Sequence, residues 1–143
     1  MIRGRFDADG RPFLEARVYI RSLKISADIP FLVDTGADRT VVMPTDGARL
    51  NINYEKLSDP ITSLGIGGAS EDFQVDATIF FKDEDESLVG YSCKLVVTRP
   101  AKEKLKLPSL LGRNVLDRWN LTYNARGQDI HAHYHDADFI HRD

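Results

Sequence analysis

Residues 29–38 read Ile29-Pro30-Phe31-Leu32-Val33-Asp34-Thr35-Gly36-Ala37-Asp38. The apolar run predicts a buried strand, and Asp34 places a carboxylate directly at its end. A charged carboxylate in that position is costly unless water or a partner group stabilises it. A second copy of the chain could supply this partner, because two Asp34 carboxylates in contact cannot both ionise easily and would share one proton over a wide pH range. The stretch therefore predicts an acid and a base in one site.

Two further segments add to this pattern in a fixed order along the chain. Leu64-Gly65-Ile66-Gly67-Gly68 is rich in glycine, which permits the positive-φ turns of a mobile hairpin, and Leu110-Leu111-Gly112-Arg113-Asn114 ends an apolar pair with glycine. Together with Asp34-Thr35-Gly36 these segments resemble the retropepsins, the homodimeric aspartic proteases typified by retroviral enzymes. The resemblance implies an all-β, retropepsin-like acid protease fold with closed, barrel-like antiparallel sheets, a flap hairpin and one short C-terminal helix.

The resemblance also implies the roles of individual residues. Asp34 would be the catalytic acid of each protomer, Thr35 would hydrogen-bond across the dimer axis, and Gly36 would let the backbone approach the carboxylates closely. Asp38 and Arg113 are expected to form a charge-assisted pair near the substrate, with two separate exposed charges as the alternative. Arg39 has no counterpart in the motif and belongs either to a subsite or to the surface. The expected substrate-binding residues are Ala37, Asp38, Val41, Gly65, Ile66, Gly67, Gly68 and Leu110, and the expected structural or dimer residues are Gly112 and Arg113.

Alternation of apolar and polar residues predicts the remaining strands. Period-two patterns cover residues 14–20, 73–81 and 91–97, which is typical of half-buried antiparallel strands. The acidic run Asp83–Glu86 separates the last two and predicts a solvated hairpin tip. Helical content is expected only at Pro44–Leu50, where proline lies near the start, and at Gly112–Trp119, where Val115, Leu116 and Trp119 share an apolar face.

Length and composition bound the domain organisation. A chain of 143 residues fits a single domain, with a core expected at about 13–134 and a flexible C-terminal tail at 136–143. Only one Asp-Thr-Gly follows an apolar strand, so a two-lobed monomeric protease does not fit and the second catalytic half must come from another copy. Cys93 is the only cysteine, on the apolar face of its strand, and is expected to be a core thiol rather than a nucleophile.

Charge and hydropathy restrict the partners. The net charge is −3 with no basic stripe, which argues against nucleic acid as a partner. No stretch approaches membrane-spanning length and no signal-peptide pattern opens the chain, so we expect no membrane partner and a cytoplasmic location. His131, His133 and His135 alternate along one predicted strand and offer a zinc site as the least favoured function, because no further ligand completes the set.

These observations predict a homodimeric aspartic endopeptidase that acts on a peptide or protein substrate. One Asp34 from each protomer would form the dyad that activates water, with no metal and no organic cofactor. Ala37 stands where the two-lobed relatives carry a hydroxyl, so the pH optimum is expected nearer neutrality than theirs. The alternative is a catalytically silent retropepsin-like module that binds peptide or dimerises. The long, polar C-terminal segment departs from retroviral proteases, whose chain ends form much of the dimer.

Overall fold

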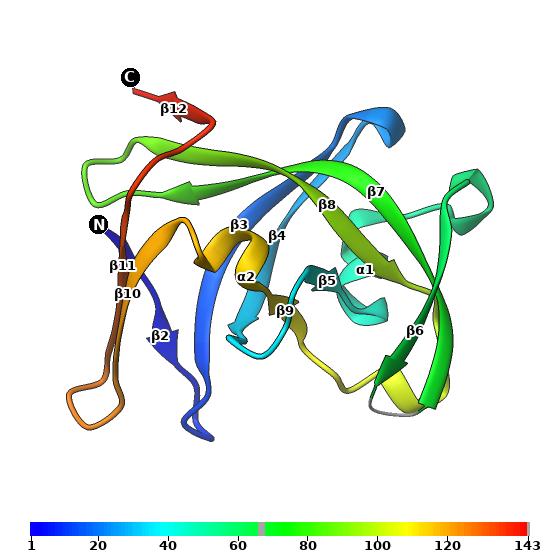
Figure 1. Ribbon diagram of the computed structural model, residues 1–143, viewed down its shortest axis with the longest axis horizontal. Coiled ribbons are helices and arrows are strands. Elements are labelled where there is room, and N and C mark those ends of the chain that lie inside the picture. Colours follow the sequence, from blue (N-terminus) through cyan, green and yellow to red (C-terminus); the bar gives the residue numbers. More distant parts are fainter. Residues whose placement is uncertain (66–67, 143) are drawn as a thin grey trace.

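The computed structural model describes residues 1–65 and 68–142, and strands make up most of it (Figure 1). The two α-helices are short, as the sequence predicts. In chain order the strands and helices are β1 (Ile2–Arg3), β2 (Arg5–Phe6), β3 (Pro12–Ile20), β4 (Ile25–Val33), β5 (Thr40–Val42), α1 (Pro44–Leu50), β6 (Pro60–Gly65), β7 (Gly68–Lys82), β8 (Leu88–Thr98), β9 (Ser109–Leu111), α2 (Arg113–Leu116), β10 (Trp119–Asn124), β11 (Asp129–Tyr134) and β12 (Phe139–His141).

Six strands close into a barrel in the order β8, β5, β9, β4, β3 and β7, because β7 also pairs with β8. Strand β6 extends β7 into a hairpin, and β12 continues the sheet beyond β8. A separate small sheet has the order β1, β11, β10. The closed, all-β fold confirms the prediction, but not all of the strand pairs are antiparallel. The β4–β9 and β5–β8 pairs are parallel, because long connections separate the partners along the chain and return them in the same direction.

The barrel core consists of the inward-facing residues of the predicted alternations. On β3 the side chains of Leu14, Ala16, Val18 and Ile20 are buried, while the intervening polar side chains are exposed. β7 repeats the pattern with Ala77, Ile79 and Phe81, whereas on β8 the four consecutive residues 95–98 are all buried. Three aromatic rings pack together in the core: Phe81 packs edge-on against Trp119 at 4.8 Å, and the Trp119 indole donates a hydrogen bond of 2.8 Å to the Tyr91 hydroxyl. Each such buried aromatic side chain contributes about 1.5–3 kcal/mol through removal of apolar surface from water.

The two helices match the sequence analysis to different extents. α1 begins at Pro44 and ends at Leu50, as predicted, with Asn51 in the left-handed conformation at its C-terminal cap. α2 is shorter than the predicted Gly112–Trp119 segment, because it ends at Leu116 and Trp119 already begins β10. The predicted apolar face nevertheless exists, since Val115, Leu116 and Trp119 are all buried.

Both ends of the chain are more structured than the sequence predicts. Ile2 is only 2% exposed, so the core extends beyond the expected 13–134 boundary. Residues 139–141 of the expected flexible tail form β12, which pairs with residues 88–90 of β8. The short length of these strands gives no periodic signal, and their pairing depends on a partner far away in the sequence.

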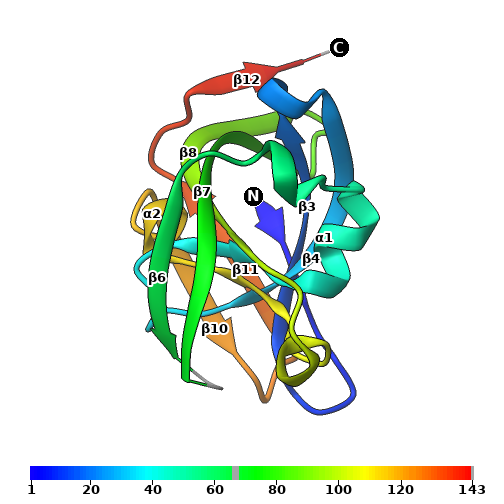
Figure 2. The same cartoon turned by 90° about the vertical axis from the view of Figure 1, so that its right-hand side faces the viewer.

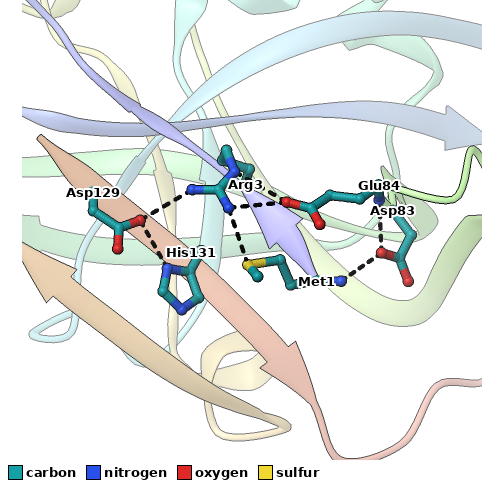
Figure 3. A network of polar contacts seen from close by, with 6 residues as sticks. All are labelled: Met1, Arg3, Asp83, Glu84, Asp129 and His131. Carbon is teal, nitrogen blue, oxygen red and sulfur yellow. Dashed lines mark hydrogen bonds and ion pairs between the residues drawn. The ribbon is translucent and has the colours of Figure 1, made fainter.

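A network of polar contacts joins the N-terminal segment to two distant parts of the chain (Figure 3). The Arg3 guanidinium lies between Glu84, at 3.0 Å, and Asp129, at 3.2 Å. Asp129 also contacts the His131 ring at 2.8 Å, and the Met1 amino group lies 2.6 Å from Asp83. The acidic tip of the β7–β8 hairpin is therefore exposed, as predicted, and also serves as the partner of the first strand.

Candidate active site

The loop after β4 holds Asp34 in a tight turn. The Asp34 N–H donates to the carbonyl of Leu111 at 3.1 Å, which extends the parallel β4–β9 ladder by one residue. The Ala37 N–H donates to the Asp34 carbonyl at 3.2 Å, and the Gly36 N–H donates to Asp34 Oδ1 at 2.9 Å. A Cβ at position 36 would lie 3.2 Å from the same oxygen, so glycine suits this close approach. Asp34 is half-buried, which leaves its carboxylate accessible from one side.

The residues that follow β9 hydrogen-bond to the backbone of this loop. The Arg113 N–H donates to the Ala37 carbonyl at 2.8 Å, and the Asn114 N–H donates to the Asp38 carbonyl at 3.2 Å. A Cβ at Gly112 would lie only 2.3 Å from the backbone oxygen of Arg39, so no side chain fits there. The Gly112 requirement predicted from the motif therefore has a steric cause in this structure.

A buried threonine links the same two segments. Thr40, at the start of β5, is fully buried, and its hydroxyl accepts a hydrogen bond of 3.2 Å from the Gly112 N–H. The same hydroxyl donates to Asn114 Oδ1 at 2.8 Å. Satisfied buried polar groups of this kind fix geometry, because leaving any one of them unpaired costs about 1–3 kcal/mol. The sequence analysis missed Thr40, and it quoted Asn114 within the Gly112 motif without giving it a role.

Asp38 and Arg113 are in direct contact, as expected, and not two separate charges. The Arg113 guanidinium also donates to the carbonyl of Thr35 at 2.8 Å, so one side chain contacts the loop on both sides of Gly36. The Asp38 side chain is 80% exposed and that of Arg113 41%, so the pair contributes at most about 1 kcal/mol to stability. Its effect is to orient the loop and to neutralise the charge of Asp38.

An apolar row lies beside Asp34 on the barrel wall. Leu110 of β9 is the register partner of Leu32 on β4 and of Val41 on β5, and all three are half-buried. Side chains two residues apart on a strand point to one face, so Leu32 and Asp34 share a face. Val41 and Leu110, two of the expected substrate-binding residues, lie in this row, and Leu32, which the sequence analysis missed, could have been found by counting back two residues from Asp34.

The hairpin of β6 and β7 corresponds to the predicted flap. Pairing runs from Pro60 opposite Phe73 to Gly65 opposite Gly68, while Ile66 and Gly67 of the predicted tip lie outside the described residues. β7 keeps its pairing with β8 only as far as Asp72, so the residues before Asp72 pair with β6 alone. In Figures 1 and 2 this arm and the β10–β11 hairpin both point downwards, and Figure 1 shows them at opposite ends of the long axis of the molecule.

Two buried polar contacts near the flap and β9 gave no signal in the sequence. Lys104 and Asp72 are both buried, and their charged groups lie 3.9 Å apart where β7 leaves the barrel. The Ser109 hydroxyl, also buried, donates to Asp46 Oδ2 at 2.5 Å and accepts from the Met43 N–H at 2.9 Å. The first contact ties the 99–108 connection to the flap, and the second ties β9 to α1.

The other candidate residues take no part in this site. Burial raises the pKa of the Cys93 thiol to about 12, so it stays neutral at physiological pH, as expected of a core thiol. His131 and His133 project outwards from β11 with ring centroids 5.5 Å apart, and His135 follows the end of that strand. Within the described part of the chain, no three His, Cys, Asp or Glu side chains gather into a potential metal site. No helix in residues 1–65 or 68–142 has the length and apolar character needed to cross a bilayer.

Comparisons with known proteins agree with the geometry. The profile of the aspartyl protease family matches residues 16–115, which include the Asp34 loop, the flap and the Gly112 segment. The chain belongs to the aspartyl protease family. Its fold is similar to that of a retropepsin-like aspartic protease from Rickettsia conorii, with a TM-score of 0.57 and 22% identity over 93% of this chain and 89% of that one. It is also similar to the EIAV protease bound to an inhibitor, with a TM-score of 0.50 and 21% identity over 78% of this chain and 90% of that one. No curated protein matches the sequence.

Proposed function

We propose that this aspartyl protease family member is an endopeptidase that acts as a homodimer, with one Asp34 from each protomer in the catalytic dyad. The observation that carries the proposal is the Asp34 loop, in which a half-buried carboxylate is held by the Gly36 N–H on one side and left accessible on the other. A single chain supplies one such carboxylate. Hydrolysis by an acid and a base therefore needs a second copy, because no other acidic residue follows an apolar strand in this way.

The chemistry requires the two Asp34 carboxyl groups to share one proton. The ionised carboxylate takes a proton from a water molecule as the water oxygen bonds to the scissile carbonyl carbon. The protonated carboxyl gives its proton to the carbonyl oxygen, which forms a tetrahedral diol. Collapse of the diol breaks the carbon–nitrogen bond while a proton passes to the leaving amine. Thr35 would hold the two loops at a fixed separation across the axis.

The dimer can form at the small sheet. Within the described residues no strand pairs with the outer edge of β10, and Tyr123 on that strand is 57% exposed. Unpaired edges of this kind are templates for strand addition. In Figure 1 the β10–β11 hairpin and the loop that follows β4 both lie on the lower side of the molecule, so pairing of β10 with its symmetry mate would bring two Asp34 loops towards each other.

Cleavage of a diverse peptide mixture between about pH 4 and pH 8 tests the proposal. The native chain is expected to cleave, Asp34→Asn to be inactive, and Asp28→Asn to be active. Asp28 is a matched control because it lies in the middle of β4, away from the loop, with a side chain 71% exposed. Activity should rise faster than linearly with protein concentration at low concentration, and an excess of Asp34→Asn should inhibit the native chain by forming mixed dimers with one carboxylate.

The alternative is a silent module that binds peptides or dimerises without cleaving them. Binding of peptides by a dimer that shows no Asp34-dependent cleavage at any concentration or pH would favour this alternative. Cleavage retained by Asp34→Asn would contradict the endopeptidase mechanism directly.

A further inference from the structure

Arg39 is the one charged residue of the Asp34 loop that the proposed site leaves without a role. Its side chain is exposed and makes no hydrogen bond or ion pair with any described residue. The neighbouring charges are already satisfied, because Asp38 pairs with Arg113. An arginine that keeps five donors unpaired beside a catalytic loop is available to a ligand.

Strand register places Arg39 in one row with Asp34. Leu32, Leu110 and Val41 are partners across β4, β9 and β5. β9 runs parallel to β4 and antiparallel to β5. Two residues after Leu32 and Leu110 come Asp34 and Gly112, and two residues before Val41 comes Arg39. Asp34, Gly112 and Arg39 are therefore the next row across the three strands.

A close backbone approach supports this placement. A Cβ at Gly112 would lie 2.3 Å from the Arg39 oxygen and 2.4 Å from its carbonyl carbon, so the two residues are immediate neighbours. Thr40 is fully buried between exposed Arg39 and half-buried Val41, which is the alternation expected if the side chains of positions 39 and 41 share the open face. Arg39 therefore continues the apolar row on the side of Asp34.

We propose that Arg39 selects substrates with a carboxylate side chain close to the scissile bond. The inference rests on the proposed function and names its substrate class: extended peptides with apolar residues on the Leu32, Leu110 and Val41 row and Asp or Glu beside them. Asp34 and Arg39 lie two strand spacings apart, about 10 Å, which corresponds to about three residues of an extended peptide. A homodimer presents Arg39 twice, so one acidic residue is accepted on either side of the cleaved bond.

The test uses sets of peptides that differ only by Glu, Gln or Lys at one position, scanned across the four residues on each side of the cleaved bond. Cleavage is measured for the native chain, Arg39→Gln and Arg39→Glu, with Arg21→Gln as the matched control. Arg21 loses the same charge, but it precedes β4 at the end opposite to Asp34. Binding of the same peptides to Asp34→Asn is measured in parallel, because that readout does not require catalysis.

The native chain is expected to prefer Glu over Gln by about three- to tenfold in kcat/KM at one position on each side, since an exposed charge-assisted contact is worth little more. Arg39→Gln should abolish the preference, Arg39→Glu should reverse it towards Lys, and Arg21→Gln should keep it. The preference should also shrink at high salt. Equal use of Glu and Gln at every position, or a preference that survives in Arg39→Gln, overturns the inference while cleavage itself stands. If cleavage fails but the Asp34→Asn variant binds the Glu peptides more tightly through Arg39, the endopeptidase proposal falls and the Arg39 inference holds.

Discussion

Replacing Asp72 with Asn should destabilise the protein strongly, because it leaves Lys104 charged in a buried position. The Lys104 side chain is 9% exposed and that of Asp72 is 5% exposed. Removing one member of a buried ion pair costs about 3–5 kcal/mol, since the remaining charge has lost both water and partner. The 3.9 Å separation exceeds hydrogen-bond distance, which favours the lower end of that range. A loss of about 3 kcal/mol would lower Tm by about 10 °C in a chain of this length.

Denaturant unfolding at fixed protein concentration measures this effect, because the proposed dimerisation would make apparent stability concentration-dependent. Asp76→Asn is the matched control on the same strand, where the side chain is 83% exposed and pairs with Lys94, and it should change stability by less than about 0.5 kcal/mol. Adding Lys104→Met to Asp72→Asn should recover much of the loss, because the buried charge is then gone. A loss below about 1 kcal/mol for Asp72→Asn, or no recovery in the double variant, would refute the reasoning.

Three further changes test the site and its surroundings. Gly112→Ala should lower kcat/KM for a cleaved peptide by about a hundredfold, because the new Cβ would displace the Arg39 backbone and with it the Asp34 loop. Unchanged kinetics would show that the loop tolerates the shift. The Cys93 thiol, with its pKa raised to about 12, should react with iodoacetamide at pH 8 only after unfolding, and rapid alkylation of the folded chain would contradict this. The free energy of unfolding should also fall as pH rises from about 9 towards 12, because the thiol ionises at lower pH in the unfolded chain than in the folded one. Ala37→Ser should shift the acid limb of the pH profile for cleavage downward, because a hydroxyl donor favours the ionised carboxylate, and an unmoved limb would show that position 37 does not contact the dyad.

The features that the sequence predicts are those with a local cause. Period-two alternation places the buried face of β3 and β7 correctly, and the apolar run before Asp-Thr-Gly is a strand, as predicted. Proline near the start of α1 predicts the position of that helix, and its first and last residues are those expected. In each case the signal lies within a few neighbouring residues, so no knowledge of the partner strand is needed.

The features that the sequence did not predict depend on partners distant in the chain. The connection over residues 99–108 has the composition of a solvated loop, yet Lys104 is buried against Asp72. β12 is too short to show a period and is defined by its pairing with β8. The parallel β4–β9 pair likewise depends on a crossover of many residues, which alternation along one strand cannot reveal.

The long-range contacts around Asp34 fit the proposal that each chain supplies half of a catalytic site. A dyad requires each carboxylate to sit within a fraction of an ångström of its productive position before the second copy arrives, because a misplaced group costs rate steeply. Here the loop that carries Asp34 is held by three neighbours that approach from different sides: the Leu111 carbonyl, the Arg113 backbone and the Arg113 guanidinium. All three come from the β9–α2 segment, which Ser109 anchors to α1 through Asp46. These contacts hold the Asp34 loop within a single chain, so in the proposed homodimer the second copy would need to supply only its carboxylate.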